Sequence, residues 1–356
     1  MTPSPAASQD ILRQNIFQAM MHARKELLEN LYHNRAWYLT HTLVEGTNTS
    51  KWMLRCDATA ELTCRKEVER LAKEDNVDVQ VYGEESLWDI IPDEPIVLTK
   101  SHPSVILLDM IDGSDLLERD LGNWCSAAVL FDPKEGRILT SIIQDSHNDI
   151  YFATEHGAWF IKVETQRDAD GKYHLMPSQS VPLGGPHHPF PPGKPRDIDD
   201  NYASICFYGQ KGGHFVELPG TFRAWLSEKE RPDDPRSGLR FRGRLYTLAG
   251  NPMMAKLANG DRIHVVFEHI GQYAHDAVPG LFIALKSGAT ALRLQDEPDY
   301  EDKQKGTRVT ESDLGRSLYT PCKQDGLAYV LATTDQLAGK IFTALTGLPL
   351  AKAKSL

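Results

Sequence analysis

The sequence predicts an α+β half followed by an α/β half. Three observations support this fold class. Residues before about 75 have the apolar spacing and composition of helices. Residues 77–163 form short β-branched or leucine-rich runs separated by turn residues, and the last third alternates between helical and strand-like segments. The 356 residues suffice for a large core, and we expect three parts, namely 1–160, 161–240 and 241–356.

The first part begins with helices and continues with strands. We expect a helix over 8–45 with a rough apolar stripe that includes Ile16, Met20 and Leu27, and a second helix over 58–73. The loop EGTNTSK separates them. The strand-like runs that follow are 77–86, 95–100, 104–110, 125–133, 138–145 and 149–163. DPKEG at 132–136 predicts a hairpin turn.

The middle part is rich in loop residues. Residues 164–200 contain DADGK and a dense proline and glycine tract, which predict a loop or insertion. NYASICFYG predicts one strand before the polar stretch at 227–238. The last part predicts the following elements: a helix at 251–260, a strand at 263–269, a helix at 276–289 that ends at Gly288, and a strand and helix within 326–348.

Composition excludes several classes of protein. The net charge of −10 makes the chain a poor candidate for non-specific binding to nucleic acid or to an anionic membrane. No run approaches the roughly 18 apolar residues of a membrane span, and the N-terminus lacks a signal-peptide pattern. The five cysteines are scattered, without a zinc-type cluster. We therefore expect a cytoplasmic protein that is able to bind cations.

The chemistry is concentrated in VILLDMIDGSDLLERDL. An apolar run ends at Asp109, and Asp112, Gly113 and Ser114 follow. Two carboxylates at the end of a buried run need a partner, and Mg²⁺ prefers carboxylate and phosphate oxygens. The turn can direct both carboxylates and the Ile111 carbonyl toward one small volume. The Gly113 and Ser114 amides precede a plausible helix start, where an anion is favoured.

An ordinary Asx-rich turn explains this motif equally well when it is taken alone. Three other segments favour the metal site. GEES at 83–86 places two glutamates at a strand end, Asp57 is followed one helical turn later by Glu61, and Asp276 lies at a helix start, in a capping position.

Together, GEES, DMIDGS and HDAVPGLFIALKSGA resemble the inositol monophosphatase family. This family lies within the superfamily of Mg²⁺-dependent, lithium-sensitive sugar phosphatases that includes fructose-1,6-bisphosphatase. The segments occur in the family's order, and the resemblance extends over roughly 10–160 and 240–350. It implies a layered αβαβα sandwich, two or three Mg²⁺ ions, a small phosphorylated substrate, inhibition by Li⁺, and often a homodimer.

The resemblance also implies a role for each matching residue. Glu84, Asp109 and the Ile111 carbonyl would bind the first metal, and Asp109, Asp112 and Asp276 the second. Asp57 and Ser114 would orient the attacking water and, with Glu84, form the catalytic set. The amides of Gly113 and Ser114 would hold the phosphate.

Several positions depart from the family pattern. Met110 replaces the usual proline between the two aspartates, and His275 replaces the usual tryptophan before the last aspartate. Lys286-Ser287-Gly288-Ala289 replaces the usual Glu-Ala-Gly-Gly. The acidic residue expected to bind substrate hydroxyls has only an inexact match in Glu268, which lies eight positions before Asp276.

These patterns favour a Mg²⁺-dependent phosphomonoesterase acting on a small polyol or sugar phosphate such as inositol monophosphate. A sugar bisphosphatase or a 3′-phosphonucleotide phosphatase of the same fold is the alternative enzyme. The alternative of another class is a catalytically silent relative that binds a phosphorylated metabolite. The retained set of metal ligands argues against the silent relative.

Overall fold

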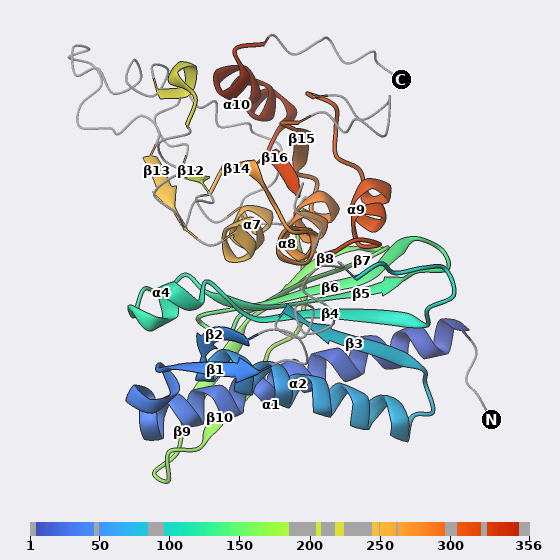
Figure 1. Cartoon of the computed structure of the whole chain (residues 1–356), viewed down its shortest axis with the longest axis vertical. Coiled ribbons are helices and arrows are strands. Elements are labelled where there is room, and N and C mark those ends of the chain that lie inside the picture. The colour runs from blue at the N-terminus through green and yellow to red at the C-terminus, as the bar shows by residue number, and fades with distance from the viewer. Residues whose placement is uncertain are drawn as a thin grey trace.

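The computed structural model describes residues 5–45, 50–84, 96–184, 204–207, 218–223, 244–248, 250–260, 263–295, 305–321 and 326–348. Its elements stack in alternating layers of helix and sheet (Figure 1). Helices α1 (Pro5–Tyr38) and α2 (Arg55–Glu74) lie under a large sheet, and α7 (Gly250–Ala258) and α8 (Ala274–Lys286) lie above it. A smaller sheet and α10 (Asp335–Thr346) complete the stack. The predicted αβαβα sandwich is confirmed.

The large sheet has seven strands in the order β11-β8-β7-β6-β5-β4-β3. Its strands are β3 (Val79–Gly83), β4 (Ser104–Asp112), β5 (Cys125–Asp132), β6 (Arg137–Asp145), β7 (Ile150–Thr154), β8 (Gly157–Ile161) and β11 (Val181–Pro182). Only the β3–β4 pair is parallel, and the other neighbours are antiparallel. This parallel pair matters for function because it places two strand ends side by side.

The smaller sheet has five strands in the order β13-β12-β14-β16-β15. Its strands are β12 (Ser204–Phe207), β13 (Arg244–Thr247), β14 (Val265–Gln272), β15 (Thr290–Arg293) and β16 (Leu327–Ala332). A buried apolar cluster that includes Val330, Ile341 and Phe342 joins this sheet to α10. Helix α9 (Glu311–Ser317) packs near α8 and begins with a capping box at Thr310 and Asp313.

Buried clusters on both faces explain why the large sheet is so apolar. Ile16 and Met20 of α1 pack with Ile106 and Leu130 on one face. The opposite face contacts α7 and α8 through residues such as Val105 and Phe282. A strand that is buried on both faces reads as a continuous apolar run, as SVILL does here.

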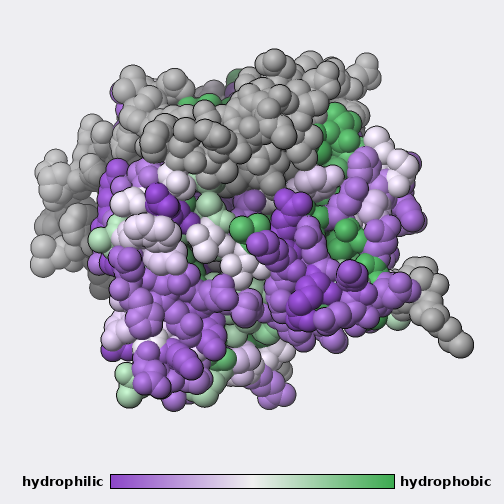
Figure 2. Space-filling view, turned by 60° about the horizontal axis from the view of Figure 1, so that its bottom comes forward, coloured by the Kyte–Doolittle hydropathy of each residue, from purple (hydrophilic) through white to green (hydrophobic). Residues whose placement is uncertain are grey.

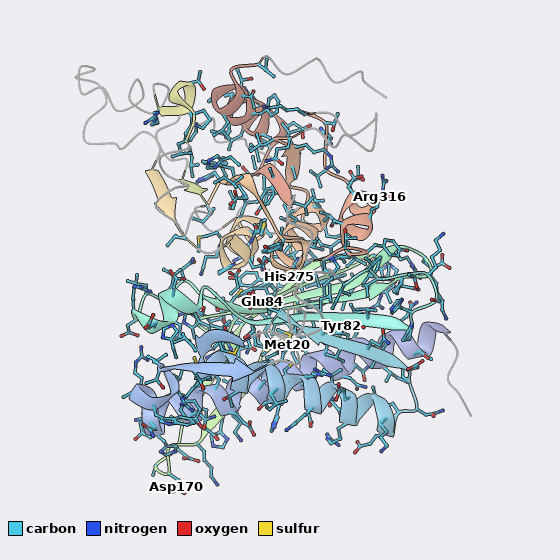
Figure 3. All side chains as sticks on the ribbon, viewed as in Figure 1. Met20, Tyr82, Glu84, Asp170, His275 and Arg316 are labelled. Atoms are coloured by element: carbon cyan, nitrogen blue, oxygen red, sulfur yellow. The ribbon has the colours of Figure 1, made fainter. Side chains whose placement is uncertain are left out.

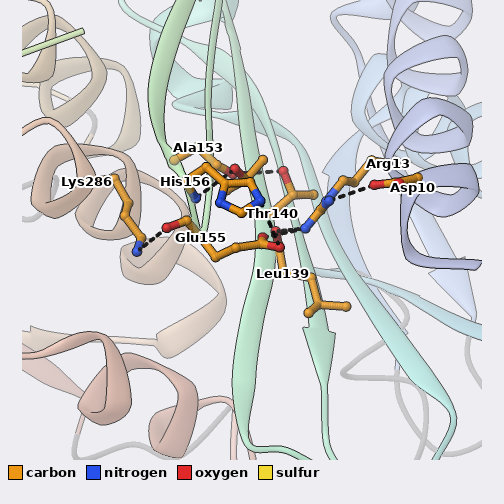
Figure 4. A network of polar contacts seen from close by, with 9 residues as sticks. Asp10, Arg13, Leu139, Thr140, Ala153, Glu155, His156 and Lys286 are labelled. Carbon is orange, nitrogen blue, oxygen red and sulfur yellow. Dashed lines mark hydrogen bonds and ion pairs between the residues drawn. The ribbon is translucent and has the colours of Figure 1, made fainter. Parts of the chain in front are cut away.

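The outer face of α1 and α2 is largely hydrophilic (Figure 2). Ion pairs such as Arg70 with Glu67 and Glu74 lie on the exposed side of α2. At one edge of the large sheet, Glu155 links two helical layers (Figure 4). Its carboxylate pairs with Arg13 of α1 at 2.5 Å, and its carbonyl accepts from Lys286 of α8 at 3.2 Å.

Three expectations about elements are wrong. The helix predicted over 8–45 ends at Tyr38, and β1 (His41–Glu45) then pairs with β2 (Ser50–Leu54). Residues 96–100, which lie in the described part of the predicted strand 95–100, form no strand. The predicted loop at 164–200 begins with a hairpin of β9 (Val163–Arg167) and β10 (Tyr173–Pro177). Non-helical backbone at Asn34 kinks the helix before its end at Tyr38, and β-branched Thr42 and Val44 favour the strand that follows.

The predicted turns, by contrast, form. Gly136 closes the 132–136 turn by donating to the Asp132 carbonyl at 2.9 Å. DADGK is the tip of the β9–β10 hairpin, where the Asp168 side chain accepts from the Asp170 and Lys172 amides at 3.0 and 2.9 Å. The proline-rich residues 185–200, with His187 and His188, lie outside the described residues, as does the polar stretch at 227–238. Among the described helices, none combines the length and apolar character that a bilayer crossing requires.

Candidate metal centre

Four of the predicted ligands, namely Glu84, Asp109, Asp112 and Asp276, come together at one edge of the large sheet. The parallel strands β3 and β4 end next to each other, with Gly83 opposite Leu108. Glu84 directly follows β3, and Asp109 and Asp112 lie in the last residues of β4. In both strands, a carboxylate residue lies at or directly after the strand end. Because the two strands are parallel neighbours, these side chains lie at the same end of the sheet.

An extra residue in β4 orients the two aspartates. Asp109 lies opposite Ala127 and Asp112 opposite Cys125, so three steps along β4 match two steps along β5. In a regular strand, residues three apart point to opposite faces. The bulge places Asp109 and Asp112 on the same face, beneath α7 and α8. The Asp109 Oδ1 also accepts the Ile111 N–H at 3.1 Å.

Asp276 reaches this edge from the other half of the chain. It is the third residue of α8. Oxygens of Glu84, Asp109 and Asp276 all lie within 4.8 Å of one another. Figure 3 shows Glu84 and His275, the neighbour of Asp276, between the large sheet and the layer of α7 and α8. The capping position predicted for Asp276 is wrong, because Tyr273 is the N-cap and makes no side-chain cap bond.

Mutual repulsion and burial raise the pKa of the aspartates in β4. Burial is the largest cause of the raised pKa of Asp109, followed by the charges of Glu84, Asp112, Asp276 and Asp57. The pKa of Asp112 rises to about 8 through burial and the charge of Asp276, although the Asn251 amide opposes the shift. An all-oxygen set of crowded carboxylates with raised pKa values fits a hard divalent cation.

Asp57 and Glu61 line the site from α2. Asp57 is in the first turn of α2 and is buried, and its charge is among those that act on Asp109. Glu61 is one turn further along and is also buried. Its carboxyl group fills the space beside Gly83, so the glycine of GEES is explained by close packing. The second glutamate of that motif, Glu85, lies outside the described residues.

Gly113 and Ser114 join β4 to the short helix α4 (Ser114–Glu118). Gly113 is the N-cap and has φ 88°, a left-handed conformation that favours glycine. The short helix therefore begins directly after Asp112. The amides at the start of α4 consequently lie at the same edge of the sheet as the carboxylates.

Glu268 lies in an irregular part of β14. Its exposure is 1 %, and the β14–β16 register shifts between Glu268 and Gln272. The Glu268 Oε1 accepts the amides of Ile270 and Gly271 at 2.7 and 3.2 Å, while no described residue bonds to its Oε2. Burial raises the pKa of Glu268 to about 7. One oxygen thus supports the backbone irregularity between Glu268 and Gln272.

Asn251 is a site residue that sequence reasoning missed. It is fully buried in α7. Its backbone N–H donates to Asp112 Oδ2 at 3.0 Å, and its Oδ1 accepts the Gly280 N–H of α8 at 2.8 Å. Asn251 therefore connects α8, which contains Asp276, to the ligand at the end of β4. Its position directly before Pro252 at a helix start was the one available signal.

The two departures from the expected pattern have defined surroundings. Met110 is buried and packs in the cluster below the sheet. His275 is buried, with Nδ1 3.1 Å from the Pro321 carbonyl and Nε2 3.0 Å from Asp276 Oδ1. Its ring stacks on Tyr273 at a centroid distance of 5.5 Å. His275 thus contacts a predicted ligand directly as well as packing in the wall of the site.

Comparisons with solved structures identify the fold. The chain matches the extragenic suppressor protein SuhB of Bartonella henselae at a TM-score of 0.54 and 14% identity, covering 93% of this chain and 98% of that one. It matches inositol monophosphatase II of Staphylococcus aureus at a TM-score of 0.52 and 13% identity, covering 95% of this chain and 92% of that one. It matches fructose-1,6-bisphosphatase of Leishmania major at a TM-score of 0.57 and 10% identity, covering 97% of this chain and 96% of that one.

No protein-family profile matches this chain. No curated protein sequence matches it either. The chain has the fold shared by inositol monophosphatases and fructose-1,6-bisphosphatase, and this confirms the fold expected from GEES, DMIDGS and the α8 segment.

Proposed function

We propose that this chain, which has the sugar-phosphatase fold, is a Mg²⁺-dependent phosphomonoesterase that hydrolyses a small polyol or sugar phosphate. An inositol monophosphate is the first candidate substrate. The observation that supports this function is the convergence of Glu84, Asp109 and Asp276, from three separate elements, to within 4.8 Å. The fold neighbours named as inositol monophosphatase and fructose-1,6-bisphosphatase favour the same reaction class.

The chain supplies oxygen ligands for two or three Mg²⁺ ions. Glu84, Asp109 and the Ile111 carbonyl would hold the first, and Asp109, Asp112 and Asp276 the second. Bound Mg²⁺ would supply water activation and neutralisation of the charge that develops on the phosphate and the leaving oxygen. The raised pKa of Asp109 and Asp112 supports this assignment, because a cation relieves the repulsion that raises it.

The remaining residues would position the reactants. Asp57 and Ser114 lie on elements that meet at the same edge, and they would orient the attacking water. The amides of Gly113 and Ser114 would bind the phosphate at the turn after β4. Glu268 would accept a substrate hydroxyl through its buried Oε2, to which no described residue donates a hydrogen bond. A polyol or sugar offers such hydroxyls next to its phosphate.

The decisive experiment measures phosphate release with Mg²⁺ present. The substrates are inositol monophosphates, fructose 1,6-bisphosphate, other sugar phosphates and adenosine 3′,5′-bisphosphate. Asp112→Asn serves as the blank, and Asp170→Asn, at the tip of the distant β9–β10 hairpin, is the matched control (Figure 3). Release of phosphate that requires Mg²⁺ and disappears only in Asp112→Asn supports the proposal.

Other outcomes separate the alternatives. Preference for fructose 1,6-bisphosphate or the adenosine bisphosphate identifies the sugar bisphosphatase or nucleotide phosphatase alternative. Binding of several phosphate compounds without release of phosphate from any of them identifies the catalytically silent relative. For the active enzyme we also expect inhibition by Li⁺, because Li⁺ would compete for the second cation site. Activity that is indifferent to high Li⁺ contradicts that expectation.

A further inference from the structure

Arg24 is a fully buried cation on the opposite side of the large sheet from the carboxylates. It projects from α1 and has an exposure of 0 %. Its Nη2 donates to Ser126 Oγ at 3.1 Å and to the Gln144 carbonyl at 2.5 Å, and its guanidinium lies 4.2 Å from the Trp124 ring centroid. Within the described part of the chain, no carboxylate bonds to its Nε or Nη1, and the charge of Asp145 acts on it from beyond ion-pair distance. A buried charge without such a partner is costly and needs a reason.

Ser126 connects Arg24 to the turn that contains the ligands. Its hydroxyl accepts from Arg24 and donates to the Met110 carbonyl at 2.7 Å. Ser126 is itself fully buried. One hydroxyl thus joins the guanidinium to the peptide between Met110 and Ile111, which lies between the two aspartates.

The hydrogen bond between Ser126 and the Met110 carbonyl lies at the β4 bulge that orients Asp109 and Asp112. The extra residue of β4 interrupts the β4–β5 ladder between Asp109 and Asp112. A bulge leaves backbone groups without their ladder partners. Here the Met110 carbonyl finds its donor in the Ser126 side chain. The hydrogen bond therefore fixes the backbone conformation that places Asp109 and Asp112 on the same face.

Arg24 and the acidic cluster lie on opposite faces of the sheet. Cys125 and Ala127 share the face of the carboxylates, and Ser126 between them points to the other face, toward α1. The guanidinium therefore bonds this strand pair from the face opposite the acidic cluster. Burial lowers the pKa of Arg24 to about 10, which leaves it cationic at neutral pH, and the charge of Asp145 at the end of β6 opposes this shift.

We propose that Arg24 is a positioning residue that acts through Ser126 to hold the ligand-bearing bulge of β4. Its function is to keep Asp109, the Ile111 carbonyl and Asp112 in the arrangement that a divalent cation requires. The proposal rests on the proposed metal-dependent function and adds two residues that contact neither substrate nor metal.

The test measures Mn²⁺ binding rather than activity. EDTA-treated wild type, Ser126→Ala, Arg24→Lys and Thr140→Val are titrated with Mn²⁺ by calorimetry, and thermal unfolding is followed in parallel. Thr140→Val is the matched control, because it removes another buried hydroxyl whose Oγ1 donates to a strand carbonyl, that of Ala153 at 2.8 Å. This bond lies on β6 and β7, away from the bulge.

We expect Ser126→Ala to weaken Mn²⁺ binding by about 10-fold or more, as for other groups that support a metal ligand, and Thr140→Val to change it by less than about twofold. Both variants lose thermal stability. If Ser126→Ala folds poorly, Arg24→Lys gives the same readout, since lysine keeps the charge but lacks the planar group that bonds Ser126 and Gln144 together.

Each outcome decides between the two proposals. Mn²⁺ affinity in Ser126→Ala and Arg24→Lys equal to that of wild type overturns the role of Arg24 and leaves the phosphatase proposal intact. A wild type that binds no Mn²⁺ overturns both. Equal loss of affinity in Ser126→Ala and Thr140→Val shows a general effect of destabilisation and also overturns the positioning role.

Discussion

The carboxyl group of Glu61 occupies the space that a side chain at Gly83 would need. A Cβ at Gly83 would lie 1.8 Å from the Glu61 Cδ and 2.0 Å from its Oε1. The contact joins α2, where Asp57 lies, to the end of β3, where Glu84 follows. The position of a predicted metal ligand therefore depends on a glycine next to it and on a glutamate from another element.

Gly83→Ala tests this packing. The new methyl group must displace Glu61 or the end of β3, so we expect a loss of about 1 to 3 kcal/mol in the free energy of unfolding and weaker metal binding at Glu84. Chemical denaturation and Mn²⁺ titration measure the two effects. Gly220→Ala, where nothing lies within 4 Å of the added carbon, is the control. A Gly83→Ala protein as stable as wild type contradicts the prediction.

Asp109→Asn tests the central ligand. We expect metal-dependent phosphate release to fall by at least about 100-fold, beyond the range typical of groups that only support a ligand. Without metal at pH 8, the variant should be at least as stable as wild type, because folded wild type must either keep Asp109 protonated above its ordinary pKa or bury its charge in a repulsive cluster. Thermal unfolding with EDTA and with Mg²⁺ measures both states. A full Mg²⁺-induced stabilisation in Asp109→Asn refutes the assignment.

The stability of the metal-free protein should fall as pH rises. The pKa of Asp112 is about 8 in the folded chain, compared with an ordinary value of 3.8. Above pH 4 the unfolded chain loses this proton while the folded chain retains it, so unfolding becomes more favourable with rising pH until about pH 8. Asp109 acts in the same direction. The Asp112 shift alone corresponds to a decrease of about 6 kcal/mol in the free energy of unfolding over this range.

Added Mg²⁺ should reverse this dependence of stability on pH. Its binding requires ionised carboxylates, so the shift in Tm on adding Mg²⁺ should be larger at pH 8 than at pH 5.5. Thermal unfolding with EDTA or Mg²⁺ at the two pH values provides the comparison. An equal shift at both values would mean that the cluster does not gain its charge on binding metal.

Asn251→Ala tests the link between the two halves of the site. It leaves the Gly280 N–H in α8 without its acceptor, and we expect a stability loss of about 1 to 3 kcal/mol. Metal affinity should fall as well, because α8 also contains Asp276. Asn15→Ala is the control, since Asn15 is a buried asparagine that donates to Asp75 at 3.0 Å between α1 and α2. Loss of stability without loss of affinity would make Asn251 a packing residue only.

Much of the fold, and the strand ends that place the candidate ligands, could be predicted from local patterns. Apolar runs that end in Asp109 and Glu84 marked two buried strands with polar ends, and these strands are β4 and β3. The helices α2, α8 and α10 follow from their composition, and Thr334 caps α10. The β1–β2 hairpin was missed because a continuous helical composition concealed the break at Asn34, and β9–β10 because nearby prolines and glycines indicated a loop.

The sequence by itself determined which residues could bind a cation, because residue type and order along the chain are enough to recognise carboxylates at strand and helix ends. Only the tertiary structure decided how they meet. The bulge in β4 turned Asp109 and Asp112 to one face, and α8 brought Asp276 within 4.8 Å of Glu84 and Asp109. Asn251 and Ser126 were placed against the ligand-bearing strand end. These contacts join residues more than a dozen positions apart, and their geometry depends on packing between layers that no local pattern encodes.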